Sequence, residues 1–113
     1  MQRDASHFLD IIHAAKLIME YTAGLDRTEF LQSTQIQDSV IRRFEVMGEA
    51  ARRVSQEARE ALPEVPWAQM VSMRNFLIHD YGDVDLDTVW DTAQRDIPRL
   101  LEVLREATPP ETD

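Results

Sequence analysis

Cysteine is absent from this chain of 113 residues, glycine occurs only three times, and Lys16 is the only lysine. Without cysteine the chain has no disulfide framework, no thiolate zinc site and no thiol nucleophile. Neither GxGxxG nor GxxxxGKS/T occurs, which excludes the common phosphate-cradling loops. No apolar run approaches the roughly 20 residues that span a bilayer, and the N-terminus lacks the pattern of a signal peptide. We therefore expect a cytoplasmic protein without a membrane partner.

Negative charge dominates the composition. Aspartate and glutamate number 21 against 12 basic residues, which gives a formal net charge of -9. This balance argues against generic electrostatic binding of nucleic acid, and no DNA partner is expected. Eleven of the 12 basic residues are arginine, which is suited to planar, bidentate contact with phosphate. The total charge does not exclude a small basic cleft, because it says little about the local field.

Apolar residues recur at three- and four-residue steps, which predicts helices, and no alternating strand pattern is visible. The expected helices cover residues 4–22, 28–31, 36–60 and 67–79, followed by a last helix that runs to residue 107. Gly24 should end the first helix, Asp85 or Asp87 should cap the last, and Pro98 should bend it. The predicted fold class is all-α: a compact bundle of four to five helices in a single domain over residues 1–107, with a disordered tail at 108–113.

One side of the expected 36–60 helix is charged and the opposite side is apolar. At 100° per residue, the charged stripe consists of Asp38, Arg42, Glu45, Glu49 and Arg52. The simplest interpretation is a solvated face with ion pairs between residues four apart, such as Asp38 with Arg42.

The densest polar cluster is Arg74, Asn75, His79 and Tyr81, within eight residues. Histidine exchanges a proton near neutral pH, and arginine stabilises developing phosphate charge. Together they could cleave a phosphodiester without metal, with the RNA 2′-hydroxyl as nucleophile. The alternative is a helix C-terminus at which His79 favours the negative dipole end, Tyr81 packs, and Arg74 pairs with an acid such as Glu49.

Helix geometry sets a condition on this cluster. Arg74 and His79 are five residues apart, which places them about 140° apart around an ideal helix, whereas Asn75 lies beside His79. Either the helix loosens near His79, or a second copy of the chain completes the site. A two-fold pair of such helices would bring two copies of the cluster into one cleft.

The run from Trp67 to Asp85 resembles the signature of the HepT-like branch of the HEPN superfamily. Its core is Arg-x4-His-x-Tyr, here Arg74, His79 and Tyr81. The Met-Gly-Glu-Ala-Ala segment at 47–51 resembles part of that family's long second helix. Val89-Trp90, followed by Ile-Pro-Arg-Leu-Leu at 97–101, resembles its last helix, so the resemblance covers nearly the whole chain.

The resemblance implies a helical homodimer that acts as the metal-independent ribonuclease toxin of a type VII-like toxin–antitoxin pair. It implies a minimal nucleotidyltransferase as antitoxin, which can attach AMP to the motif tyrosine. Carried over residue by residue, Arg74 and His79 take the catalytic roles and Tyr81 the acceptor role. The supporting candidates are Asn75, Glu49, Asp38 and Arg42. No cofactor is expected, and His7 and His13 lack the partners that a metal site needs.

Two other functions remain open at this stage. The chain could be a non-catalytic module that docks a nucleotidyltransferase and binds a nucleotide between protomers, or a purely structural helical dimer. The intact Arg74 and His79 favour the enzyme, whereas the acidic composition favours the docking module.

Overall fold

The structure, a computed structural model, describes residues 2–72 and 84–107. All regular elements in these two ranges are helical, which confirms the predicted all-α class there. They are α1 (Gln2–Thr22), α2 (Arg27–Leu31), α3 (Thr34–Arg53), α4 (Gln56–Ala61), α5 (Trp67–Val71), α7 (Leu86–Asp91), the π-helical turn η2 (Thr92–Asp96) and α8 (Ile97–Ala107). The expected disordered tail at 108–113 lies outside the described residues.

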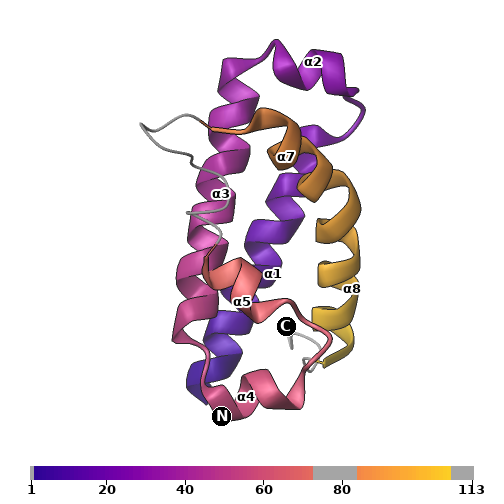
Figure 1. The fold of residues 1–113 in the computed structure, drawn as a ribbon. Coiled ribbons are helices and arrows are strands. Elements are labelled where there is room, and N and C mark those ends of the chain that lie inside the picture. The colour runs from indigo at the N-terminus through magenta and orange to yellow at the C-terminus, as the bar shows by residue number, and fades with distance from the viewer. Residues whose placement is uncertain (1, 73–83, 108–113) are drawn as a thin grey trace.

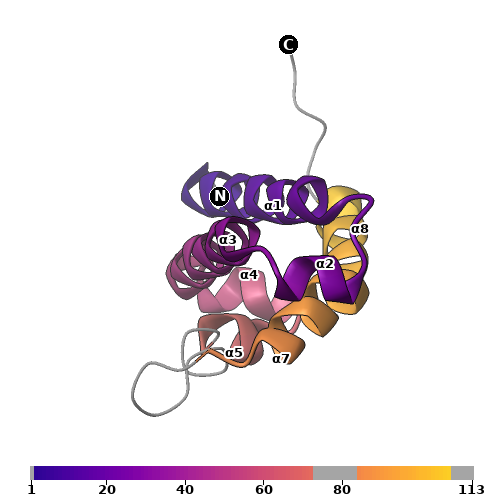
Figure 2. The same cartoon turned by 90° about the horizontal axis from the view of Figure 1, so that it is seen from above.

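The three long helices frame the bundle. Figures 1 and 2 show α3 and α8 on opposite sides, with α1 packed along both, while α5 and α7 lie across the bundle from α1. The apolar faces of these helices meet in one core. Its largest fully buried side chains include Ile11, Ile18, Phe44, Met47 and Leu104. The apolar face predicted for the second long helix is thus confirmed, and its charged face is left toward the outside.

The end of α1 follows the prediction from glycine. Gly24 has a φ of 78°, in the left-handed region that glycine adopts without strain. The Thr22 hydroxyl donates to the Ile18 carbonyl at 2.9 Å, and the Leu25 amide donates to the Thr22 carbonyl at 3.1 Å. The chain therefore turns directly from α1 toward α2.

The prediction of one continuous helix over 36–60 is wrong, because α3 ends at Arg53 and α4 begins at Gln56. Val54 is extended, and Ser55 caps α4 by accepting from the Ala58 amide at 3.1 Å. The Arg59 guanidinium donates to the carbonyls of Ala51 and Arg52, at 2.9 and 3.0 Å, and so satisfies the open end of α3.

The last predicted helix is divided as well. Asp85 caps α7 by accepting from the Thr88 amide at 3.1 Å, as the sequence suggested. The π-helical turn η2 then follows, and Pro98 is the second residue of α8. This turn lies just before Pro98, whose missing N–H interrupts the regular hydrogen-bond pattern of an α-helix. The sequence predicted a bend at Pro98 and did not predict a π-helical turn between two α-helices.

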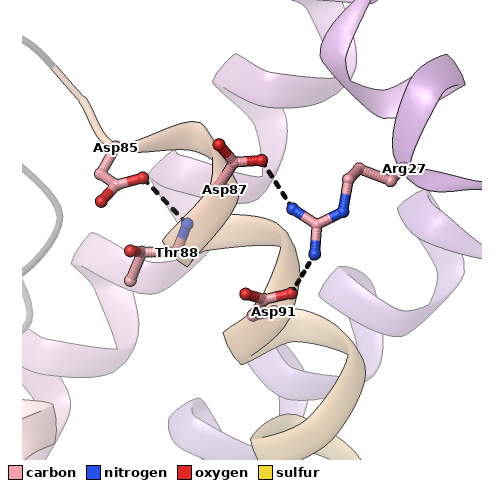
Figure 3. Close-up of polar contacts among 5 residues, drawn as sticks. All are labelled: Arg27, Asp85, Asp87, Thr88 and Asp91. Atoms are coloured by element: carbon pink, nitrogen blue, oxygen red, sulfur yellow. Dashed lines mark hydrogen bonds and ion pairs between the residues drawn. The ribbon is translucent and has the colours of Figure 1, made fainter.

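At one end of the bundle, two ion pairs join α2 to α7 (Figure 3). Arg27 donates to Asp87 at 2.6 Å and to Asp91 at 2.5 Å, and the hydrogen bond to Asp87 is the main reason that the pKa of Arg27 is raised. The same two helices also contact each other through the rings of Phe30 and Trp90, whose centroids lie 5.3 Å apart. Phe30 is fully buried, so α2 contributes to the core although it is short.

The segment that begins at Pro66 leads toward the sequence motif. Trp67 donates its indole N–H to the Leu62 carbonyl at 3.0 Å and packs on Phe8 of α1 with ring centroids 6.1 Å apart. The structure describes this predicted helix as α5, Trp67–Val71, and the described range ends at Ser72. The rest of the helix predicted over 67–79 lies outside the described residues.

Candidate functional site

A groove of about 370 Å³ lies between α1 and α3, with α5 at its edge. α1 contributes His7 and Asp10 from successive turns, and Val71 belongs to the last turn of α5. The other charged lining residues come from α3. A volume of this size falls in the range of small-molecule binding sites.

The α3 side of the groove contains four of the five residues of the charged stripe predicted from the sequence, together with Arg53 and without Asp38. Arg42, Glu45, Glu49, Arg52 and Arg53 line it, and at 100° per residue they span about 100° of the helix circumference. The opposite face of α3 is buried in the core, which fixes the rotation of the helix. The charged stripe is therefore exposed to solvent and lines a concave surface.

The predicted ion-pair pattern of this stripe is only partly correct. Glu49 and Arg53 approach to 3.8 Å across one helical turn, and both side chains are exposed. Within the described residues, Asp38 and Arg42 form no such pair. The Arg42 and Arg52 side chains are exposed there without an ion pair or hydrogen bond, so two guanidinium groups of the groove are available to a ligand.

The predicted site residues fall into two sets. Glu49 and Arg42 are brought together in the groove, whereas Asp38 does not line it, because it is a further turn away on α3. The residues of the motif cluster, Arg74, Asn75, His79 and Tyr81, lie outside the described residues. In the sequence, Arg74 follows Val71 of the groove by three residues.

Sequence reasoning missed the contribution of α1. His7 and Asp10 are three residues apart on one side of that helix, but only the packing of α1 on α3 shows that they share a groove with Arg42. The signal available in the sequence was only a histidine next to apolar Phe8. It says nothing about a tertiary neighbour 35 positions away.

Asp4, one turn before His7, anchors α1 to the α3–α4 junction. Its carboxylate accepts from the Ser55 amide at 2.9 Å and from the Ser55 hydroxyl at 2.8 Å. The backbone bond, followed by the hydroxyl bond, holds the pKa of Asp4 below its ordinary value of 3.8. Because Asp4 is buried and both oxygens are engaged, we assign it a structural role at the end of the groove.

Metal-binding groups and membrane-spanning helices were sought in the same two ranges. Across residues 2–72 and 84–107, no group of three or more histidine, aspartate or glutamate side chains is arranged to hold a metal ion. In that part of the chain, every helix is too short or too polar to cross a bilayer.

Similarity to known proteins is extensive. A family model described as "Ribonuclease HepT-like" matches residues 11–107, a range that includes the motif cluster. The protein named "Probable ribonuclease HepT" from Thermococcus cleftensis is 39% identical over 101 residues, covering 88% of this chain and 92% of its own length. "Putative RNase MJ1380" from Methanocaldococcus jannaschii is 39% identical over 100 residues, with the same two coverages. No solved structure gives a significant match.

Proposed function

The chain belongs to the HepT-like ribonuclease family, and from this premise we propose that it is a metal-independent endoribonuclease acting as the toxin of a toxin–antitoxin pair. The observation that carries the proposal is the family match over residues 11–107, which spans Arg74, His79 and Tyr81 in one continuous range. The names of the two relatives support ribonuclease activity as the chemistry.

The proposed reaction uses the RNA itself as nucleophile. The 2′-oxygen attacks the adjacent phosphorus, the bond from phosphorus to the 5′-oxygen breaks, and that oxygen leaves with a proton. His79 exchanges the proton as general acid or base, and Arg74 stabilises the negative charge that builds up on the phosphoryl oxygens. The products are a 2′,3′-cyclic phosphate and a 5′-hydroxyl, and no metal takes part.

We place the site in the cleft of a homodimer. Five residues separate Arg74 from His79, so an ideal helix directs them about 140° apart, and a partner's copy would complete the constellation. Glu49 and Arg42 of α3 are supporting residues. They line the same groove as Val71, which precedes the motif in the chain. Asn75 would support the site from beside His79, and Asp38 from outside the groove.

Neutralisation by a minimal nucleotidyltransferase completes the proposal. AMP attached to the Tyr81 hydroxyl would bring a negative phosphate and a bulky base to a site that must receive RNA phosphate. Tyr81→Phe should retain ribonuclease activity and escape modification. Intact-mass measurement after incubation with the cognate transferase and ATP tests this, and full AMP addition to the Tyr81→Phe protein would contradict the assignment.

Cleavage of end-labelled RNA by the purified protein tests the catalytic proposal. Wild type should cleave in the presence of EDTA, whereas His79→Ala should lose about 100- to 10,000-fold in rate. Circular dichroism of each variant separates lost chemistry from lost folding. Undiminished cleavage by a folded His79→Ala protein would remove this histidine from the mechanism.

The second candidate function, a non-catalytic docking module, is favoured by the net charge of -9. It predicts that the chain alone neither cleaves RNA nor harms its host, while it still binds a nucleotidyltransferase. Host growth on expression of the wild type, beside Arg74→Ala and His79→Ala, distinguishes the two: arrest that both substitutions relieve supports the toxin.

A further inference from the structure

The groove between α1, α3 and α5 combines two kinds of charged group that a nucleotide needs. Its lining includes two exposed arginines without partners in the described residues, Arg42 and Arg52, and the carboxylates of Asp10 and Glu45. Glu49 is instead occupied with Arg53. Three arginines and three carboxylates line the groove, whereas the chain as a whole carries 12 basic against 21 acidic residues, so the groove is less negative than the chain average.

We propose that this groove is a subsite for a short stretch of single-stranded RNA, formed by residues other than those of the Arg74–His79 motif. Arg42 and Arg52 bind phosphate oxygens, and Asp10 and Glu45 accept hydrogen bonds from the amino group of the base. The inference rests on the proposed ribonuclease function and extends it to substrate selection. It accounts for how so acidic a chain can hold an RNA strand without a broad basic face.

The arginine part of the subsite follows from geometry and charge. Arg42 and Arg52 are ten residues apart on one continuous helix, so they are separated by about 15 Å along its axis. This spacing lets them hold successive parts of a backbone instead of one phosphate. Neither guanidinium has to break an intramolecular ion pair within the described chain, so each can make a charge-assisted, bidentate contact with phosphate.

The carboxylate part predicts base selection. An ionised carboxylate only accepts hydrogen bonds, and cytosine, adenine and guanine each carry an exocyclic amino group that donates them. Uracil has no such group, and its N3–H donor lies between two carbonyl oxygens, which would face the carboxylates of Asp10 and Glu45 unfavourably. A single-stranded RNA exposes these base edges, which is how sequence is usually read in RNA. The subsite should therefore prefer cytosine over uracil.

The test uses 2′-O-methylated hexamers of cytidine and of uridine, which lack the 2′-hydroxyl nucleophile and stay intact. Binding to the full-length protein is followed by fluorescence anisotropy at several salt concentrations. Arg52→Ala should weaken both hexamers alike, several-fold, and lower the salt slope by about 0.7 for one lost phosphate contact. Arg42→Ala should act in the same way and serves as the independent second variant.

Matched controls isolate the two halves of the proposal. Arg105→Ala removes an exposed arginine from α8, on the opposite side of the bundle from α3, and should leave both affinities unchanged. Glu45→Ala should reduce the ratio of cytidine to uridine affinity toward one without weakening uridine binding. All variants should retain the wild-type circular dichroism, because none of these side chains is fully buried.

Three results would overturn the subsite. First, Arg52→Ala and Arg42→Ala could bind the hexamers as tightly as Arg105→Ala does, which would rule out the proposed phosphate contacts. Second, the wild type could bind the cytidine and uridine hexamers equally well, which would rule out the proposed base contacts. Sedimentation could show that Arg52→Ala separates two copies of the chain, which makes the groove a protein interface. If the wild type binds with the expected preference but cleaves no unmodified RNA, the subsite stands and the proposed ribonuclease function fails.

Discussion

At the α2–α7 end of the bundle Arg27 is held by two carboxylates, whereas in the groove Arg42 and Arg52 have no ion-pair partner within the described chain. Both regions are exposed, and both contain acidic residues close by. The two regions differ in where the arginine side chains lead. Arg27 reaches across to another helix (Figure 3), whereas both groove arginines belong to α3 and line the same groove.

The comparison separates arginines that hold the fold from arginines that remain available. Arg27 joins α2 to α7, and Arg59 satisfies the carbonyls at the end of α3, so both are engaged by the chain itself. In a chain with a surplus of acids, an arginine that stays unpaired within the described residues is the informative one. The predictions below therefore ask whether stability and RNA binding separate between the two regions.

The largest effect is expected from Phe30→Ala at the α2–α7 end. Phe30 is fully buried against Trp90, and a truncation of this kind costs about 3–5 kcal/mol of unfolding free energy. Urea denaturation measures the loss. RNA affinity of the protein that remains folded should not change. A folded Phe30→Ala protein with weakened RNA binding would break the separation of the two regions.

The next largest effect on stability is expected from Gly24→Ala. A Cβ at this position meets no neighbouring atom, so the penalty comes only from the left-handed backbone, at about 1 kcal/mol. The midpoint of urea unfolding should fall accordingly. Gly24→Asn is the matched control, since asparagine tolerates this conformation better and should lose less. Equal stability of the alanine variant and wild type would show that the turn can relax.

A pH-dependent effect is expected at Asp4. Because hydrogen bonds from Ser55 lower the pKa of this carboxyl in the folded state, the stabilisation is complete above its ordinary value of 3.8 and is lost as pH falls through the lowered value. The stability difference between wild type and Asp4→Asn should thus be present at neutral pH and vanish in acid. A difference that persists unchanged below the folded-state pKa would show that the contact does not depend on ionisation.

The smallest effect on stability is expected from Arg27→Ala. The arginine and both aspartates are substantially exposed, and exposed ion pairs contribute little because water and salt screen them. The melting temperature should change slightly, and RNA affinity should equal that of wild type. A loss of RNA binding as large as that of Arg52→Ala would contradict the division into structural and available arginines.

Much of the fold could be predicted from local signals. The apolar periodicity located α1 and α3, Gly24 marked the end of α1, and Asp85 marked the start of α7. These features depend on residues close together in the chain, so local propensity is sufficient. The prediction failed at Val54 and Ser55, where Ser55 caps α4 and also donates two hydrogen bonds to Asp4, which is 51 residues away.

The groove was only half predictable. The stripe on α3 follows from helix geometry, and so do the placements of Arg42 and Glu49 on it. His7 and Asp10 join the groove through the packing of α1 against α3, which no local pattern encodes. Pro98 led us to predict a bend and not the π-helical turn before it, because the way a helix accommodates a missing N–H depends on its surroundings.

Single-turnover cleavage of unmodified RNA by wild type, His79→Ala, Arg52→Ala and Arg27→Ala, in EDTA and at one salt concentration, tests the central claim most directly. The account predicts that His79→Ala loses cleavage almost entirely, Arg52→Ala is slowed several-fold at subsaturating protein, and Arg27→Ala matches wild type. Cleavage that survives in folded His79→Ala, or that falls equally in Arg27→Ala and Arg52→Ala, would contradict it.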